Sequence, residues 1–200
     1  SAQKPTVFIV DDDAAIRFAM QALMDSVNLD HEIFASGDEF LEKISEQRPG
    51  CLVLDIRMPG LGGLELQEEL IKRGNTLPII FITGHGDVPM AVEAMQKGAV
   101  DFIQKPFRDQ ELLDRIREAL ATDEERREEQ QQHAEVVERL HRLTNREREV
   151  FDLVVTGKPN KVIAYELGVS QRTVEIHRAR VMEKMQARSL ADLVKMHMTA

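Results

Sequence analysis

Residues 7–13 have the sequence Val-Phe-Ile-Val-Asp-Asp-Asp, which begins the pattern from which we predict the fold class. Four apolar residues in a row are typical of a parallel strand that is buried on both faces. Further short, mostly apolar runs follow along the first part of the chain. They predict strands at 31–34, 51–54, 79–82 and 102–103.

Segments with helical periodicity alternate with these strands. They predict helices at 14–27, 37–47, 63–73, 88–97 and 109–121. Five strand–helix units indicate an α/β fold, a (βα)5 doubly wound parallel sheet, whose functional crevice lies beyond the carboxyl ends of its strands. We therefore expect the functional residues directly after the strands.

The C-terminal part, residues 143–200, has a helical pattern throughout. Helices are predicted at 146–156, 160–167, 171–186 and 189–198. The second of these ends at Gly168, and the third begins after the short turn 168–170, which is typical of a helix-turn-helix. We therefore expect an all-α, four-helix domain with a helix-turn-helix.

Residues 122–142 connect the two parts and differ from both in composition. Within them, residues 123–132 contain no glycine, no proline and no apolar residue. Such a stretch favours a solvated helix, which would continue the preceding helix as a semi-rigid spacer. A coiled coil is the alternative, although only the ends of the region supply apolar positions for it. The expected domains are 1–121, a linker helix 122–142 and 143–200.

Charge is distributed unevenly along the chain. The net charge is −9, from 35 acidic and 26 basic residues. Residues 1–121 hold 21 acidic against 12 basic residues, whereas residues 144–200 hold 10 basic against seven acidic residues. An acidic body with a basic tail indicates that one part handles cations and the other meets polyanions.

The composition excludes several classes of protein. With 42% hydrophobic and 30% charged residues, the chain resembles globular proteins rather than disordered or fibrous ones. Cys51 is the only cysteine, which excludes a disulfide framework and a cysteine-based zinc site. No apolar run has the ~18 to 20 residues of a membrane span, and the N-terminus does not resemble a secretory signal. We therefore expect a cytoplasmic protein without membrane insertion.

Carboxylates gather at two of the predicted strand ends. Asp11, Asp12 and Asp13 follow the first strand, and Asp55 follows the third. A single carboxylate at such a position often only begins a turn or caps a helix. If the first and third strands are neighbours, however, three carboxylates lie within reach of one ion and do not all stay ionised without a cation. Hard oxygen ligands of this kind suit Mg²⁺.

Two further polar residues lie at the ends of later strands. Thr83 ends the fourth strand, and Lys105 ends the fifth. Each taken alone is an ordinary strand-end hydroxyl or surface lysine. On one crevice rim they offer a hydrogen-bond donor and a fixed positive charge to phosphoryl oxygens, which is what phosphoryl transfer requires.

Four separated motifs at these strand ends resemble those of a response-regulator receiver domain. They are Val-Asp-Asp-Asp at 10–13, Leu-Asp-Ile-Arg-Met-Pro-Gly at 54–60, Ile-Thr-Gly-His-Gly-Asp at 82–87 and Gly-Ala-Val-Asp-Phe-Ile-Gln-Lys-Pro-Phe at 98–107. The resemblance implies a flavodoxin-like receiver fold. It also implies that Asp55 accepts a phosphoryl group from the phosphohistidine of a sensor histidine kinase.

The same resemblance implies a Mg²⁺ cofactor beside the phosphoacceptor. The residues that would hold it are Asp11, which acts mainly through water, Asp12, Asp55 and, through its backbone carbonyl, Arg57.

The resemblance also implies roles for the residues around the acceptor. Thr83 and Phe102 would be the switch pair, in which the hydroxyl moves to the phosphoryl group and the ring turns inward behind it. Thr83 and Lys105 would contact the phosphoryl group, and the peptide bond after Lys105 is expected to be cis. Arg57 and His85 occupy positions that tune the lifetime of the phosphoaspartate, although His85 is otherwise an ordinary solvated loop residue.

Three motifs in the C-terminal part resemble LuxR-type DNA-binding domains. They are Leu-Thr-Asn-Arg-Glu-Arg-Glu-Val at 143–150, Asn-Lys-Val-Ile-Ala at 160–164 and Val-Ser-Gln-Arg-Thr-Val-Glu-Ile-His at 169–177. Together with the receiver-like part, they make the chain similar to response regulators of the NarL/FixJ subfamily, FixJ-like in particular. The residues implied to contact DNA are Arg172, Thr173, Glu175, Ile176, Arg178, Ala179, Arg180 and Lys184.

The implied DNA contacts divide into two kinds. Glu175, Ile176 and Ala179 would face base edges, whereas the basic residues would meet phosphates. Glu175 is acidic where many relatives carry lysine, so their base preference is not transferred to this chain. A carboxylate there is able to accept a hydrogen bond from a cytosine amino group.

The resemblance implies a phosphorylation-activated transcriptional regulator, with no enzymatic activity beyond its own phosphorylation and dephosphorylation. Phosphorylation of Asp55 would remodel the face of the fourth helix, fifth strand and fifth helix and favour a homodimer. Candidates for that face are Val92, Met95 and Phe107, of which the last two also suit a core. The dimer would place two helix-turn-helix units on double-stranded promoter DNA. RNA polymerase is a further candidate partner.

Two alternatives remain open at this point. In the first, Asp11 and Asp13 form the nucleophile motif of a haloacid-dehalogenase-type Mg²⁺ phosphohydrolase, with Thr83 and Lys105 as its later motifs. Against it, the first 121 residues leave no room for a cap domain, and no second acidic pair follows the fourth strand. In the second, the basic tail binds RNA or a protein instead of DNA, and salt-dependent, sequence-selective binding to duplex DNA separates these possibilities.

Overall fold

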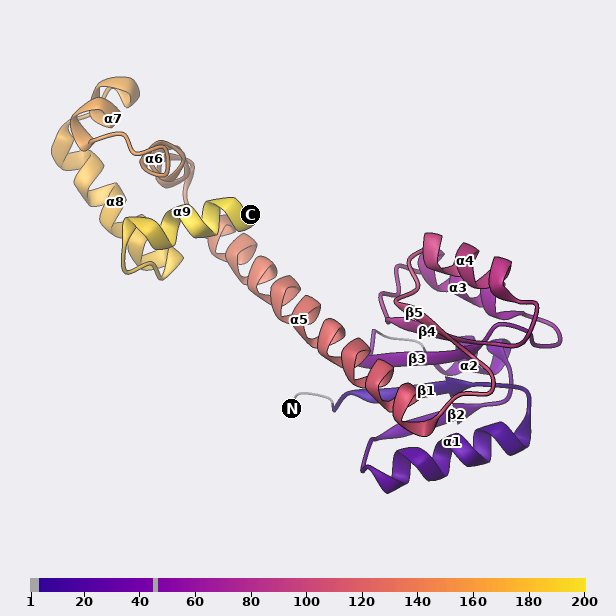
Figure 1. Cartoon of the computed structure of the whole chain (residues 1–200). Helices are drawn as coiled ribbons and strands as arrows, with labels where there is room; N and C mark the ends of the chain where they lie inside the picture. The colour runs from indigo at the N-terminus through magenta and orange to yellow at the C-terminus, as the bar shows by residue number, and fades with distance from the viewer. Residues whose placement is uncertain (1–3, 45–46) are drawn as a thin grey trace. The chain divides into compact units, whose positions relative to one another are not determined.

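The computed structural model of the chain describes residues 4–44 and 47–200. The chain divides into two compact units, residues 1–126 and residues 127–200. The first unit contains a β-sheet covered by helices, and the second is helical (Figure 1).

A five-stranded parallel sheet forms the centre of the first unit, in the order β2-β1-β3-β4-β5 (Figure 1). The strands are β1 (Thr6–Val10), β2 (His31–Phe34), β3 (Gly50–Asp55), β4 (Ile79–Thr83) and β5 (Asp101–Gln104). Every residue of β1, β3 and β4 is buried, as their apolar sequences require. The predicted doubly wound α/β fold is confirmed, and β1 and β3 are neighbours.

Helices cover both faces of this sheet. They are α1 (Ala14–Ser26), α2 (Gly37–Lys43), α3 (Gly63–Lys72), α4 (Val88–Gln96) and the first turns of α5 (Asp109–His141). Alternate residues of β1 contribute to two cores. Val7 and Ile9 pack with α1 and α5, whereas Phe8 and Val10 pack with α2, α3 and α4.

The observed elements begin and end within two residues of the predicted ones, with two exceptions. α2 ends at Lys43, where the N–H of Ile44 still donates to the carbonyl of Phe40 at 2.9 Å, rather than at the predicted residue 47. Residues 45 and 46, which the predicted helix includes, lie outside the described residues. The other exception is α5, which does not end at residue 121.

A single helix, α5, runs from Asp109 to His141 and therefore includes most of the predicted linker. Its first turns bury Leu112 and Ile116 in the core of the first unit, and its last turns bury Val136 and Leu140 in the core of the second. The apolar positions at its ends are thus used inside the two units rather than along a coiled-coil seam. Neither α5 nor any other helix of the described residues has the length and apolarity that crossing a membrane requires.

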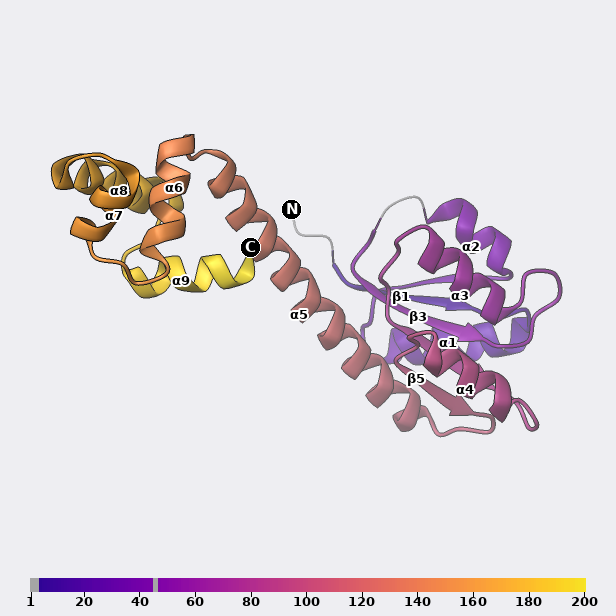
Figure 2. The ribbon, with the colours of Figure 1, turned by 90° about the horizontal axis from the view of Figure 1, so that it is seen from above.

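Four helices complete the second unit (Figure 2). They are α6 (Asn145–Val154), α7 (Asn160–Leu167), α8 (Gln171–Met185) and α9 (Leu190–Thr199). Each contributes to a common core, which includes Phe151, Ile163, Val174, Val181 and Leu193. α7 ends at Gly168, whose φ of 65° is the left-handed conformation that favours glycine, and Ser170 caps α8. The predicted helix-turn-helix is confirmed.

Candidate functional site

Two neighbouring strands end at the same edge of the sheet and bring three aspartates together. Val10 of β1 lies opposite Leu54 of β3, so the next residues, Asp11 and Asp55, emerge side by side. One carboxylate oxygen from each of Asp11, Asp12 and Asp55 lies within 4.8 Å of the other two. This is the one group of three or more acidic or metal-binding side chains in the part of the chain that the structure describes.

The aspartate cluster carries more negative charge than its surroundings neutralise. Asp11 is 1% exposed and Asp55 is 8% exposed. Burial first, and the charge of Asp55 to a smaller degree, raise the pKa of Asp11 to about 6, against the hydrogen bond from the N–H of Asp13. Burial also raises the pKa of Asp55. The Oδ2 atom of Asp11 is buried and has no hydrogen-bond partner. These carboxylates fit a divalent cation, which would supply the missing positive charge.

Lys105 provides the positive charge that the cluster does have. Its Nζ atom lies 3.4 Å from Oδ2 of Asp55 and 3.7 Å from Oδ2 of Asp11. The peptide bond between Lys105 and Pro106 is cis, as predicted. An ammonium group at this position faces the oxygens on which a phosphoryl group would be built.

The two residues of the predicted switch pair lie on adjacent strands. Thr83 is fully buried at the end of β4, and its hydroxyl donates a hydrogen bond to the carbonyl of Ile103 on β5 at 3.4 Å. Phe102 precedes Ile103 and is half-buried, packed against the core that also contains Phe81. The hydroxyl of Thr83 thus has a backbone partner on β5.

Arg57 contributes to the site through its backbone and through its side chain. Its N–H donates to Oδ1 of Asp55 at 3.1 Å. Its exposed guanidinium group pairs with the buried carboxylate of Asp87, a residue that the sequence analysis did not identify. No sequence signal indicates this pair, because its members lie 30 residues apart in separate loops. His85, in the same loop as Asp87, is exposed, with Nδ1 3.2 Å from the amide nitrogen of Gln104.

Asp13 has a different role from the other two aspartates of its motif. It is the N-cap residue of α1, and its carboxylate accepts a hydrogen bond from the N–H of Ala15 at 2.8 Å. An aspartate in this position satisfies a backbone donor of the first helical turn. Asp13 is therefore not part of the cluster.

The second helix of the helix-turn-helix, α8, presents several of the predicted DNA-contacting residues to solvent. The exposed ones are Arg172, Glu175, Ile176, Ala179 and Arg180. Ile176 is 45% exposed although it is a large apolar side chain. The opposite side of α8 buries Val174 and Val181 in the core. The exposed residues therefore share a face that no other part of this unit covers.

Three other predicted contact residues have partners within the second unit. A guanidinium nitrogen of Arg178 donates to Oδ1 of Asn160 on α7 at 3.0 Å. The ammonium group of Lys184 donates to the buried carboxylate of Glu147 on α6 at 2.6 Å. The hydroxyl of Thr173 lies 2.9 Å from that of Ser170. Arg178 and Lys184 thus join α8 to the two helices that precede it.

The three candidates for a dimer face differ in their surroundings. Val92 and Met95 on α4 are 46% and 37% exposed. Phe107 packs against the core formed by α1 and α5, so its main role is a core role. Val88, which begins α4, is 46% exposed and extends the apolar surface of this helix.

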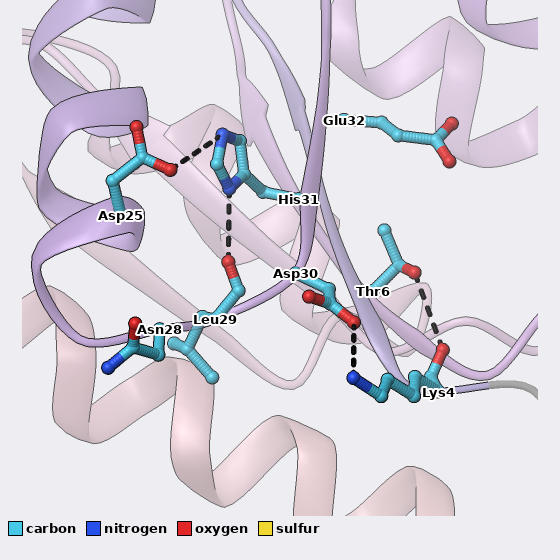
Figure 3. A pocket seen from close by; sticks show the side chains of 8 residues that line it. All are labelled: Lys4, Thr6, Asp25, Asn28, Leu29, Asp30, His31 and Glu32. Atoms are coloured by element: carbon cyan, nitrogen blue, oxygen red, sulfur yellow. Dashed lines mark hydrogen bonds and ion pairs between the residues drawn. The ribbon is translucent and has the colours of Figure 1, made fainter.

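A separate open hollow of about 640 Å³ lies at the opposite edge of the sheet, beside Thr6 at the start of β1 and His31 at the start of β2 (Figure 3). Nδ1 of His31 lies 3.0 Å from the carbonyl of Leu29, and Nε2 lies 3.8 Å from Asp25. Lys4 and Asp30 form an ion pair of 3.9 Å at its rim. Several of its polar groups therefore have partners within the hollow, which lies away from the aspartate cluster at the carboxyl ends of the strands.

Two family descriptions match this chain. Residues 7–117 match "Response regulator receiver domain", and residues 141–197 match "Bacterial regulatory proteins, luxR family". The first match contains the aspartate cluster, Thr83 and Lys105, and the second contains the helix-turn-helix.

Several curated relatives and some solved structures are similar to this chain over nearly its whole length. "Nodulation protein W" of Bradyrhizobium diazoefficiens is 49% identical over 199 residues, which are 100% of this chain and 88% of that protein. "Transcriptional regulatory protein FixJ" of Azorhizobium caulinodans is 45% identical over 97% of this chain and 92% of its own length. The structure of the response regulator StyR is 44% identical and has a TM-score of 0.90, covering 98% of this chain and 100% of that one.

Proposed function

The chain belongs to the response-regulator family, as a receiver domain followed by a LuxR-type DNA-binding domain of the NarL/FixJ subfamily, and from this premise we propose that phosphorylation of Asp55 controls its binding to promoter DNA. The family assignment goes against the alternative of a haloacid-dehalogenase-type phosphohydrolase. So does Asp13, which that alternative needs at the reacting centre, because its carboxylate caps α1. The chain is a regulator with a DNA-binding output.

The proposed reaction is a transfer between a phosphohistidine of a sensor histidine kinase and Asp55. A carboxylate oxygen of Asp55 attacks the phosphorus atom, a P–O bond forms and the P–N bond breaks. The electron pair of that bond stays on the imidazole nitrogen, which then takes up a proton. Water later attacks the same phosphorus atom and regenerates the carboxylate and inorganic phosphate. Both steps need positioning and charge neutralisation more than covalent help from the protein.

The residues around Asp55 supply that positioning. Lys105, 3.4 Å from Oδ2 of Asp55, neutralises charge on the phosphoryl oxygens. Asp11, Asp12, Asp55 and the backbone carbonyl of Arg57 would hold Mg²⁺, in agreement with the buried Oδ2 atom of Asp11, which has no hydrogen-bond partner. When bound, Mg²⁺ would offset the charge of the carboxylates and of the incoming phosphoryl group.

We propose that the switch passes from Asp55 to α4 through Thr83. The hydroxyl of Thr83 exchanges its long bond to the carbonyl of Ile103 for a phosphoryl oxygen, and Phe102 turns into the space behind it. The loop after β4 follows, and with it α4. Val92 and Met95, already exposed on α4, then form part of a homodimer face.

Dimerisation would bring two α8 helices to two half-sites of a promoter. On each helix, Arg172 and Arg180 contact phosphates, and Glu175, Ile176 and Ala179 face base edges in the major groove. The remaining predicted contact residues on α8 are Arg178, Lys184 and Thr173. Each has a partner within the second unit, and these contacts hold the helix in place. RNA polymerase is a further proposed partner of the DNA-bound regulator.

The observation that carries this proposal is the buried Oδ2 atom of Asp11, which has no hydrogen-bond partner and lies beside Asp55 at the ends of adjacent strands. To test it, the full chain is treated with acetyl phosphate and Mg²⁺. Intact mass then gives the phosphate content, sedimentation gives the oligomeric state, and footprinting on promoter fragments gives DNA binding. We expect about one phosphate per chain, a shift toward dimers and new footprints. Asp55→Asn should show none of these changes, and wild-type behaviour of that variant would refute the proposal.

A further inference from the structure

Asp87 ends the loop after β4 and pairs with Arg57 of the loop after β3, whose own N–H contacts Asp55 of the aspartate cluster. Its carboxylate pairs with the guanidinium group of Arg57 and accepts a hydrogen bond from the N–H of Gly84 at 3.1 Å. The side chain of Asp87 is 5% exposed, whereas that of Arg57 is 67% exposed. A buried anion is therefore held by one exposed cation and one backbone donor.

The position of Asp87 is that of a helix cap, but its carboxylate does not act as one. Asp87 is the N-cap residue of α4 and makes no side-chain hydrogen bond to the first turn of that helix. Asp13 and Ser170, in the same position on α1 and α8, do make this bond. N-cap side chains normally make it because the first N–H groups of a helix have no other partner. The carboxylate of Asp87 is turned instead toward Arg57 and Gly84.

Both donors that Asp87 holds are of a kind that binds phosphate. A guanidinium group binds phosphoryl oxygens through parallel N–H groups, and backbone N–H groups in tight loops also bind anions. Gly84 begins the loop after β4, and Arg57 already donates its own N–H to Asp55. Arg57 first, and Lys105 to a smaller degree, hold the pKa of the Asp87 carboxyl below its usual range. Asp87 thus holds two donors, one of which, Arg57, contacts the proposed phosphorylation site through its own backbone N–H.

We propose that Asp87 is the resting-state counter-anion of the phosphorylation site: its carboxylate occupies Arg57 and the N–H of Gly84 until the phosphoryl group on Asp55 takes them over. Asp87 is then a positioning residue for the switch, and this role rests on the proposed phosphorylation of Asp55. The phosphoryl group carries the larger negative charge and therefore displaces the carboxylate from the shared donors. The carboxylate, once released, is free to cap α4, which carries Val92 and Met95.

The experiment measures how readily the full chain binds beryllofluoride, a phosphoryl mimic, at a fixed Mg²⁺ concentration by ¹⁹F NMR. Asp87→Asn keeps the size of the side chain but removes its charge, so the competing anion is lost. We expect the half-saturating beryllofluoride concentration to fall about two- to five-fold, the upper part of the range for loss of a partly exposed ion pair. Glu93→Gln removes a carboxylate from an exposed ion pair with Lys97 on the same helix and should leave the value unchanged.

A double-mutant cycle separates this role from a merely structural one. In the Arg57→Ala background, Asp87→Asn should lower the half-saturating concentration by a smaller factor than in the wild type, because Arg57, one of the two shared donors, is already absent. The inference is overturned if Asp87→Asn weakens beryllofluoride binding, or if its effect is the same with and without Arg57. Should Asp87→Asn fail to fold, Asp87→Ser carries the same test. If the wild-type chain itself binds no beryllofluoride, the proposed function fails, and that outcome is distinct from a failure of the Asp87 inference alone.

Discussion

At the scale of single residues, the side chains at the ends of β1 and β3 determine the chemistry. Asp11 and Asp55 are buried, and Lys105 is their one nearby ammonium group in the described residues. The sequence predicts this cluster because parallel neighbouring strands place their next residues together. It does not predict the pair of Arg57 and Asp87, because a loop-to-loop contact leaves no periodic signal.

Lys105 competes with a divalent cation for the same carboxylates. Lys105→Met should therefore raise Mg²⁺ affinity about three- to ten-fold, since a positive charge within 4 Å of two ligands is removed. The same variant should slow phosphorylation by acetyl phosphate at least about ten-fold, because charge on the phosphoryl oxygens is no longer neutralised. Isothermal titration calorimetry and intact mass measure the two effects. Lys72→Met, on the exposed face of α3, is the control, and weaker Mg²⁺ binding by Lys105→Met would contradict this account.

Glu175 and Arg172 should affect DNA binding in different ways. Glu175→Gln should relax base preference at one position of each half-site, by about 1 to 3 kcal/mol. Arg172→Ala should weaken binding to all sequences and reduce the dependence of log K on log salt by about one unit. Competition titrations with substituted duplexes at several salt concentrations distinguish the two. A uniform loss of affinity in Glu175→Gln would show that Glu175 does not face a base.

At the scale of elements, apolar periodicity in the sequence was sufficient to locate the strands and helices. It gave no indication of the buried polar contacts between them. α5 illustrates both. Its continuation through residues 123–132 follows from their helix-favouring composition. A further contact with the sheet comes from Asp123, which is 2% exposed and accepts a hydrogen bond from the N–H of Gly50 at 2.9 Å. A charged residue in a polar stretch gives no sign of being buried, so this contact was not predicted.

Asp123 should be more important for stability than its neighbours in the polar stretch. Asp123→Ala removes the acceptor of the Gly50 N–H and the partner of Arg126, which lies 2.6 Å away. A buried donor left without its acceptor costs about 1 to 3 kcal/mol, and we expect a loss of that size in urea unfolding of the first unit. Glu124→Ala, one residue further along and exposed, should change stability by less than about 0.5 kcal/mol. Equal effects of the two variants would contradict this role.

Glu147 should make the second unit sensitive to acid. Burial alone would raise the pKa of Glu147, but its bonds to Lys184 and to the N–H of Thr144 hold the pKa below the ordinary value. A group with a depressed pKa stabilises the fold above its unfolded pKa and loses this effect as pH falls through its folded pKa. Between about pH 6 and about pH 3, the wild type should therefore lose on the order of 1 kcal/mol more stability than Glu147→Gln.

Hydrogen–deuterium exchange of the peptides from α6 and α8 measures this loss in the full chain. Glu149→Gln, which affects an exposed ion pair with Arg146 on α6, should behave like the wild type. If Glu147→Gln and the wild type lost the same stability as the pH falls, the ion pair of Glu147 with Lys184 would not be the source of the acid sensitivity.

At the scale of the whole molecule, the uneven charge of the chain corresponds to its two units. The acidic clusters at strand ends belong to the receiver, and the exposed arginines of α8 belong to the DNA-binding unit. The sequence predicted this division from composition alone, since the excess of acidic residues before residue 122 and of basic residues after residue 143 is visible without a structure. In the proposed function, the two units are linked by phosphorylation of Asp55.

The most direct way to identify the phosphorylated residue is to trap it chemically. An acyl phosphate is reduced by borohydride to an alcohol, so a phosphorylated aspartate becomes homoserine and is located by peptide mass spectrometry. After treatment with acetyl phosphate and Mg²⁺, we predict homoserine at position 55, and none at positions 11, 12 or 87. Homoserine at another aspartate, or none at position 55 in a chain that has gained the mass of a phosphate, would contradict the account.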